Sequence, residues 1–176
     1  MSARRAIPTF TPTFTRAFAL ALGLVSLAAL ALGVRAEEPN ITHAQPLLPR
    51  EKLTIITHDG KRHVFNVEMA KTPDQQTIGL MFRTHVGDDE GMLFDWGVPR
   101  ESQMWMRNTL VPLDMVFISA DGSIRTIAEN TVPKSLAVVA SHGPVRATLE
   151  LAGGITEKDD IRVGDRIEGA IFPAKP

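Results

Sequence analysis

The residues best suited to chemistry lie close together in one short segment. Trp105, Arg107, Asn108, Thr109 and Asp114 place an aromatic face, a cation, an amide, a hydroxyl and a carboxylate within ten residues. An indole face can stack on a sugar ring, and amide, carboxylate and guanidinium groups hydrogen-bond hydroxyls. The segment therefore predicts a shallow polar site for a small ligand.

A structural role explains the same segment. Trp105 would belong to the core, and Asn108 would order a turn through side-chain-to-backbone hydrogen bonds. Asp114 would then form a buried clamp with Arg83 or Arg107. The residue types alone leave both interpretations open.

Two further carboxylates could act with Asp114. Glu150 stands between Leu149 and Leu151 in a strand-like run, so its side chain points away from both leucines. Glu129 precedes a polar loop. A glycosidase-type hydrolase needs two carboxylates at a set separation, and Asp114 with either glutamate is a formal pair. Buried ion pairs with Arg83, Arg107 or Arg146 explain the same carboxylates.

The sequence contains no recognisable metal-binding or cofactor-binding motif. His58 and His63 flank an expected turn and would share one face, but two ligands are too few, and neither has an evident carboxylate partner. Met104 and Met106 would lie on one strand face opposite Trp105, a pattern typical of a core. No phosphate loop, dinucleotide fingerprint or nucleophile elbow is present. We expect no metal and no cofactor.

Charge is unevenly distributed along the 176 residues. Arg4, Arg5, Arg16 and Arg35 are the only charged side chains in the first 36 residues, so the rest carries 15 basic against 20 acidic side chains, a formal net charge of −5. Such a balance argues against nucleic acid as a partner. The absence of cysteine excludes disulfides and a lipid-modified N-terminal cysteine.

The N-terminus resembles an export signal. A basic segment precedes the uncharged run AFALALGLVSLAALALGV over residues 17–34, followed by Val34-Arg35-Ala36. This pattern predicts a signal peptide over 1–36, cut after Ala36, and a periplasmic or secreted bacterial protein. Retention as an uncleaved membrane anchor is the alternative, because about 18 apolar residues can nearly span a bilayer.

The remainder divides into an extended linker over 37–50 and a single domain over 51–172. Asp-Gly pairs between β-rich runs predict two hairpins. Two more strands are expected near the C-terminus. The expected strands are Leu53–Thr57, Val64–Glu68, Met115–Ile118, Ser123–Ile127, Ala147–Leu151 and Arg166–Ile171.

One helix is well signalled. Thr72 suits the cap, Pro73 the first helical position, and Ile78, Met81 and Phe82 recur at helical spacing. A second, single-turn helix is expected over 156–160 with threonine as its cap. The expected fold is mainly β (α+β), a compact barrel-like or sandwich-like antiparallel sheet with one or two short helices.

Several segments, in this order, carry a family resemblance. They are EMAKTP from Glu68, GLMFR from Gly79, EGMLF from Glu90, WMRNTLVPLDMVFI from Trp105, ATLELAGG from Ala147 and VGD from Val163. Together they closely resemble domain-of-unknown-function family 192, over about residues 53–171. The resemblance implies a compact β-rich domain, often exported in bacteria, for which no activity is established. Arg107 stands where the family more often has lysine.

We therefore expect an exported envelope protein that is a non-enzymatic binding or accessory module for a small ligand, carbohydrate included. Its partner would be that ligand or another envelope protein, with membrane contact only through an uncleaved N-terminal segment. A carboxylate-based hydrolase of envelope glycans and a scaffold for a protein partner are the alternatives. The candidate ligand-binding residues are Arg83, Trp105, Arg107, Asn108, Asp114 and Glu150.

Overall fold

The computed structural model describes residues 40–172, so the predicted signal peptide and residues 37–39 of the predicted linker lie outside the described residues. Within the described part, no helix is long and apolar enough to cross a membrane. The elements in chain order are β1 (Arg50–Ile56), β2 (Arg62–Ala70), α1 (Pro73–Ile78), β3 (Glu90–Met104), β4 (Leu113–Ile118), β5 (Ile124–Thr131), β6 (Val139–Ala152), α2 (Ile155–Lys158) and β7 (Arg166–Glu168).

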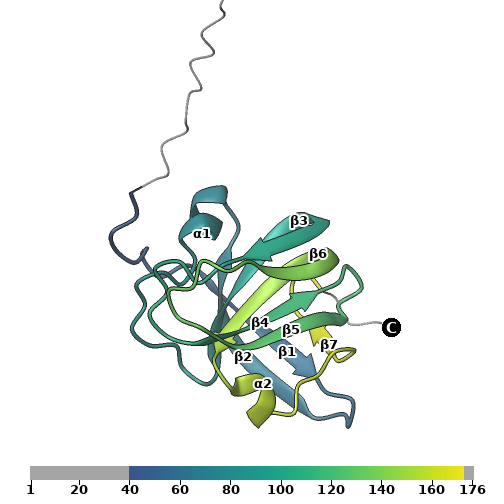
Figure 1. The fold of residues 1–176 in the computed structure, drawn as a ribbon. Coiled ribbons are helices and arrows are strands. Elements are labelled where there is room, and N and C mark those ends of the chain that lie inside the picture. Colours follow the sequence, from purple (N-terminus) through teal and green to yellow (C-terminus); the bar gives the residue numbers. More distant parts are fainter. Residues whose placement is uncertain (1–39, 173–176) are drawn as a thin grey trace, which may run out of the picture. The chain divides into compact units, whose positions relative to one another are not determined.

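All seven strands belong to one strongly curled sheet in the order β5-β4-β6-β3-β2-β1-β7 (Figure 1). The two ends of the sheet approach each other, because Ser123, at the tip of the β4–β5 hairpin, forms a bridge with Arg166 at the start of β7. The predicted mainly β, barrel-like fold is confirmed in the form of a curled half-barrel with two short helices.

One strand pair departs from the expected antiparallel pattern. β2 and β3 run parallel, with Glu68 opposite Met92. Parallel neighbours need a crossover of a dozen or more residues, and residues 71–89, which include α1, form that connection. The expectation of a wholly antiparallel sheet is therefore wrong at this pair.

Both Asp-Gly hairpins are present. The turn of the first hairpin comprises five residues, because the last paired residues are Ile56 and Arg62. The Gly60 N–H donates to the Thr57 carbonyl, and Gly60 adopts a φ of 81°. This five-residue turn places His63 opposite Ile55.

β3 is the longest strand of the described residues, and only its last residue, Met104, was expected to lie in a strand. Its pattern is broken by Gly97, with a φ of 75°, and by Pro99. The register with β6 shifts between Asp95 and Arg100 at this point. Such an irregularity removes the regular alternation on which strand prediction depends.

Both helices are shorter than the sequence pattern predicts. Thr72 and Gln75 form the capping box of α1, but the helix ends at Ile78 because Gly79 leaves the helical region with a φ of 51°. Met81 and Phe82 therefore lie in the following turn. The predicted Thr156 cap of the second helix is also wrong. Gly154 is the N-cap, and the Thr156 side chain is used elsewhere.

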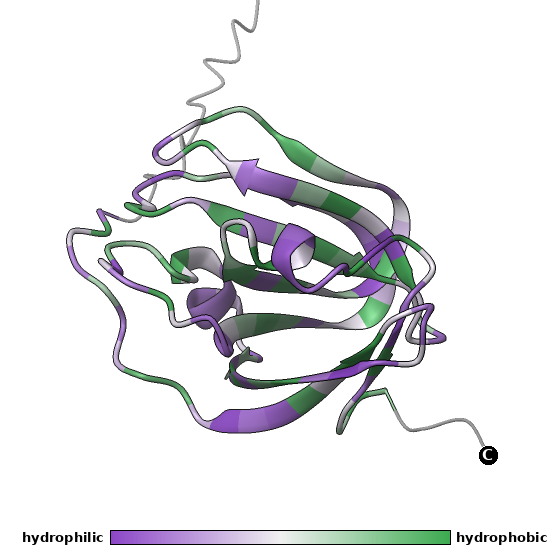
Figure 2. Cartoon of the chain, turned by 90° about the horizontal axis from the view of Figure 1, so that it is seen from below, coloured by the Kyte–Doolittle hydropathy of each residue, from purple (hydrophilic) through white to green (hydrophobic). Residues whose placement is uncertain are grey.

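Alternate residues of the central strands face two separate cores, and the strands in Figure 2 change hydropathy along their length. In β4, Val116 and Ile118 belong to the first core, whereas Met115 and Phe117 belong to the second. The second core is covered by the segment after α1, through Leu80. The candidate site opens beside this second core.

Candidate functional site: a cavity over Glu150

A cavity of about 400 Å³ lies between α1, β3, β6 and the turn after β3. α1 and its following turn form one wall, which ends at Met81. β3 contributes Phe94, Trp96 and Arg100, and the turn after it contributes Trp105. Pockets of this size hold small organic ligands.

Glu150 from β6 is a buried carboxyl of this cavity, with only 4% of its surface exposed. It is paired across the sheet with Met92 of β3 and Met115 of β4, both fully buried. Among the described residues, none forms a hydrogen bond or ion pair with its carboxyl. Burial alone raises the pKa of Glu150 to about 8. At neutral pH the group is therefore mostly protonated, and it can both donate and accept a hydrogen bond.

Trp96 forms a fixed wall of the cavity. Its ring stacks on Phe94 with 5.8 Å between centroids, and its indole N–H donates to the Thr148 hydroxyl at 3.2 Å. Thr148 is fully buried and stands two residues before Glu150, so both point to the same face of β6. The Arg100 guanidinium lies over the Trp96 ring, 4.3 Å from its centroid.

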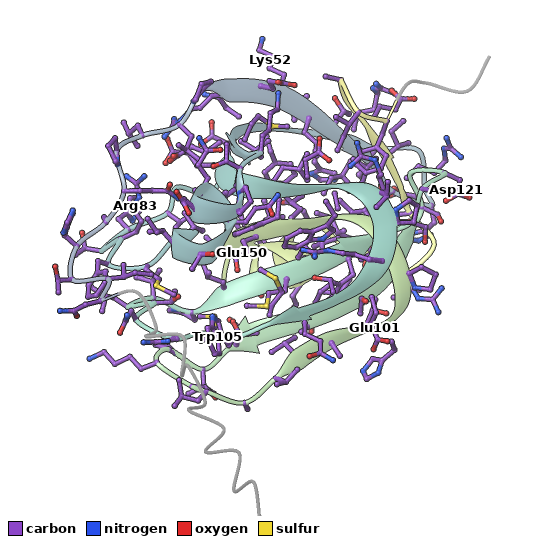
Figure 3. The ribbon with its side chains drawn as sticks, turned by 90° about the horizontal axis from the view of Figure 1, so that it is seen from above. Lys52, Arg83, Glu101, Trp105, Asp121 and Glu150 are labelled. Carbon is purple, nitrogen blue, oxygen red and sulfur yellow. The ribbon has the colours of Figure 1, made fainter. Side chains whose placement is uncertain are left out.

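Trp105 and Arg107 form the more open side. Trp105 follows the end of β3 and keeps 41% of its surface exposed. The Arg107 guanidinium lies 5.5 Å from the centroid of its ring. Each tryptophan of this cavity is thus paired with an arginine, an arrangement that cation–π attraction favours. In Figure 3, Glu150 lies near the centre of the view and Trp105 nearer the edge.

Arg83 lies apart from this cavity and neutralises a different carboxylate. Glu68 belongs to the same row across the sheet as Glu150, with Met92 between them. The Arg83 guanidinium contacts the Glu68 carboxylate at 3.2 Å, beside a smaller cavity of about 70 Å³. Two buried carboxyls therefore flank Met92, of which one has an arginine partner and the other opens into the large cavity.

Asp114 is a structural clamp on the opposite face of the sheet. Because Met115 pairs with Glu150, the neighbouring Asp114 pairs with Leu151 and faces the first core. Its carboxylate accepts four hydrogen bonds: from the backbone N–H groups of Asn130, Gly154 and Thr156, and from the Thr156 hydroxyl. The clamp is therefore made with backbone groups and not with an arginine, as was considered from the sequence.

Asn108 orders a turn and does not line the cavity. It adopts a φ of 57°, and its carbonyl accepts a hydrogen bond from the Phe82 N–H at 2.9 Å. Its amide contacts the Met81 sulfur at 3.8 Å. These two contacts join the turn after β3 to the segment that follows α1.

Neither pair of carboxylates considered for a hydrolase faces a common cavity. Asp114 and Glu150 project from opposite faces of the sheet. Glu129 lies on the Asp114 side, where its carboxylate and that of Asp114 both accept from the Thr156 hydroxyl. The pair of Asp114 and Glu129 does not form a two-carboxylate site open to a substrate, because the Asp114 side chain is fully buried.

The histidines have carboxylate partners that the sequence did not reveal. His63 Nδ1 lies 3.2 Å from Asp159, and His58 lies 3.9 Å from Asp165. Within residues 40–172, no group of three or more metal-binding side chains is assembled.

Of the six candidate ligand-binding residues, Trp105, Arg107 and Glu150 line the cavity, and Arg83, Asn108 and Asp114 do not. Sequence reasoning missed Trp96, Arg100, Gln76 and Gln103, which also line it. The chain has two tryptophans, Trp96 and Trp105. The rarity of this residue type is the sequence signal that could have identified Trp96 as a candidate.

Residues 54–169 match the model of the family DUF192, described as an uncharacterized ACR. The chain belongs to this family. The predicted membership is thus confirmed. No curated protein matches the chain.

Two solved structures resemble this DUF192 member over almost their whole length. A candidate transcription regulator from Sinorhizobium meliloti 1021 is 45% identical, with a TM-score of 0.70, and the match covers 73% of this chain and 99% of that one. A protein of unknown function from Novosphingobium aromaticivorans DSM 12444 is 39% identical, with a TM-score of 0.67, covering 74% and 94%.

Proposed function

We propose that this DUF192 member is a non-enzymatic module that binds a small ligand in the cavity over Glu150. The observation that carries the proposal is a buried carboxyl at a cavity of ligand size, without a partner among the described residues. A buried polar group without a partner costs about 1–3 kcal/mol. A ligand that hydrogen-bonds Glu150 would recover that cost.

The other lining residues support a binding role. Phe94, Trp96 and Trp105 supply apolar faces, and Arg100 and Gln103 supply polar groups near the opening. Such a mixture, mostly apolar with a few polar groups, is typical of small-ligand sites. Among the described lining residues Glu150 is the only carboxyl, which favours binding over hydrolysis by two carboxylates.

Export and a location in the cell envelope belong to this proposal, on the strength of the apolar run and cut site over residues 17–36. The net charge of −5 on residues 37–176 gives no support to nucleic acid binding here, whatever the role of the Sinorhizobium meliloti protein.

Tryptophan fluorescence is the direct test, because both tryptophans of the chain line the cavity. We expect one class within a panel of cell-wall sugars, amino acids and organic acids to change the emission and to raise the melting temperature. Glu150→Leu should abolish both responses while the variant stays folded. Glu101→Gln, on an exposed position of β3, should keep them. A folded wild-type protein that responds to no ligand class would refute the proposal.

A further inference from the structure

More than half of the large apolar side chains that stay exposed in the described residues gather at one place. Five of these nine, which we call the apolar patch, come from the turn after β3 and from the loop between β5 and β6: Trp105, Leu110, Val132, Leu136 and Val138. Val132 and Leu136 keep 68% and 66% of their surface exposed. Exposed apolar side chains scattered singly need no explanation, whereas a cluster of them marks a contact surface.

Backbone hydrogen bonds join the two segments that form the patch. The Met106 N–H donates to the Ser135 carbonyl at 3.0 Å, and the Lys134 N–H donates to the Thr109 carbonyl at 3.1 Å. Met106, Ser135 and Thr109 each stand next in sequence to a residue of the patch. The apolar side chains of the two segments are therefore held close together by their backbones while they remain exposed.

Charge distinguishes the patch from the rest of the domain. Residues 104–112 and 131–139 contain no aspartate or glutamate, and their charged side chains, Arg107 and Lys134, are basic. Lys134 is exposed in the middle of the second segment. The chain after residue 36 has a formal net charge of −5, so this surface departs from the general charge and complements an anionic partner.

The residue types of the patch fit a lipid surface better than a protein partner. Binding hot spots between proteins are enriched in tryptophan, tyrosine and arginine and poor in leucine and valine, and four of the five patch residues are leucine or valine. Leucine and valine are favourable in a lipid environment, and tryptophan is enriched at the boundary between membrane and water. A neighbouring lysine is attracted to anionic headgroups.

We propose that the apolar patch docks the folded domain on an anionic phospholipid surface. Trp105, Leu136 and Val138 insert their side chains into the outer part of the leaflet, and Lys134 lies at the level of the phosphates. This contact belongs to the domain itself and is separate from any contact of the N-terminal apolar run. Trp105 also lines the cavity over Glu150, so docking brings the opening of that cavity to the lipid headgroups.

Sedimentation with lipid vesicles tests the proposal. The protein starts at Glu37, because the apolar run over residues 17–34 would bind lipid by itself, and residues 39–176 form a compact unit of their own. One kind of vesicle contains phosphatidylglycerol with phosphatidylethanolamine, and the other contains phosphatidylcholine alone. We expect binding to the first, about fivefold weaker binding or less to the second, and a shift of tryptophan emission to shorter wavelength on binding.

Substitutions in the loop between β5 and β6 test the role of the patch. The double variant Leu136→Ser, Val138→Ser should bind anionic vesicles at least about tenfold more weakly, because it removes apolar surface. Lys134→Gln should bind them about fivefold more weakly and leave the weak binding to phosphatidylcholine unchanged.

Val163→Ser is the matched control. Val163 is 62% exposed too, but it lies at the other end of β5, where the following residue donates to the Ile124 carbonyl. This variant should bind vesicles as the wild type does. Circular dichroism verifies that each variant is folded.

Three results would overturn the proposal. A folded wild type that sediments with neither kind of vesicle has no lipid-docking surface. Equal vesicle binding by the wild type and the double variant would place the lipid contact elsewhere on the domain. Dimers of the wild type that bind no vesicle, and that the double variant does not form, would assign the patch to a second copy of the chain. None of these results bears on the cavity, because ligand binding there is tested separately by fluorescence titration.

Discussion

Glu150 is the residue at which local chemistry departs most from the surrounding pattern. Its neighbours in the row across the sheet are Met92 and Met115, so an apolar side chain would fit the position without cost. A carboxyl stays there in its neutral form because burial raises its pKa to about 8. That neutral form is a donor and acceptor held beside a cavity.

The raised pKa of Glu150 makes stability depend on pH. Between its ordinary pKa of 4.5 and about 8, the folded protein keeps a proton that the unfolded chain loses. The contribution of this group is therefore complete below about pH 4.5 and declines as pH rises, by up to about 1.4 kcal/mol per pH unit. Glu150→Gln keeps the shape but cannot ionise. Its free energy of unfolding, measured by urea denaturation, should equal that of the wild type near pH 5 and be higher than that of the wild type near pH 9.

The comparison requires only the difference between the two proteins at each pH, so other titrating groups cancel. Stability curves that stay parallel from about pH 5 to pH 9 would contradict a proton held by the folded state at Glu150.

At the scale of elements, Asp114 connects three pieces of the chain. It lies in β4 and accepts hydrogen bonds from Asn130 near the end of β5, from Gly154 at the N-cap of α2, and from Thr156 within α2. Asp114→Ala would leave these donors without a partner in a buried position. We expect a loss of about 3 kcal/mol or more in the free energy of unfolding, measured by chemical denaturation.

Glu129→Ala is the control for this substitution, because Glu129 is exposed and adds one long contact of 3.4 Å to Thr156. It should change stability by less than about 0.5 kcal/mol. An Asp114→Ala protein that is as stable as the wild type but no longer binds ligand would contradict the structural role and indicate that Asp114 takes part in ligand binding.

How far the sequence predicts these elements depends on whether the signal is local. The two hairpins follow from Asp59-Gly60 and Asp121-Gly122, and the start of α1 follows from Thr72. The β2–β3 pair is not local, since 19 residues separate the strands, and nothing in either strand specifies the partner. β3 itself is interrupted at Gly97, which hides its period.

The site was predictable in part for the same reason. Trp105, Arg107 and Glu150 were identified by residue type. Asp114 was grouped with them because it lies within ten residues of Trp105, and only the pairing of Met115 with Glu150 shows that Asp114 faces the other core. A shift of one residue in the strand register would move Asp114 to the face of Glu150. The register between distant strands cannot be inferred from a single sequence.

At the scale of the whole molecule, the first 36 residues predict the destination of the domain. We expect mass spectrometry of the protein recovered from the periplasm or medium of a bacterial host to show Glu37 as the first residue. Ala36→Phe should block cleavage, because the signal pattern has a small residue at that position. Recovery of the chain with residue 1 to 36 still attached, in the membrane fraction, would instead identify an anchor.

The position of β1 in the sheet has a consequence for the timing of folding. β1 lies between β2 and β7, and Ile55 pairs with Ile167 close to the other end of the described chain. During synthesis this edge of β1 stays unpaired until β7 has left the ribosome, and pairing over such a sequence distance is slow. The barrel therefore closes late, after the other described strands have been synthesised.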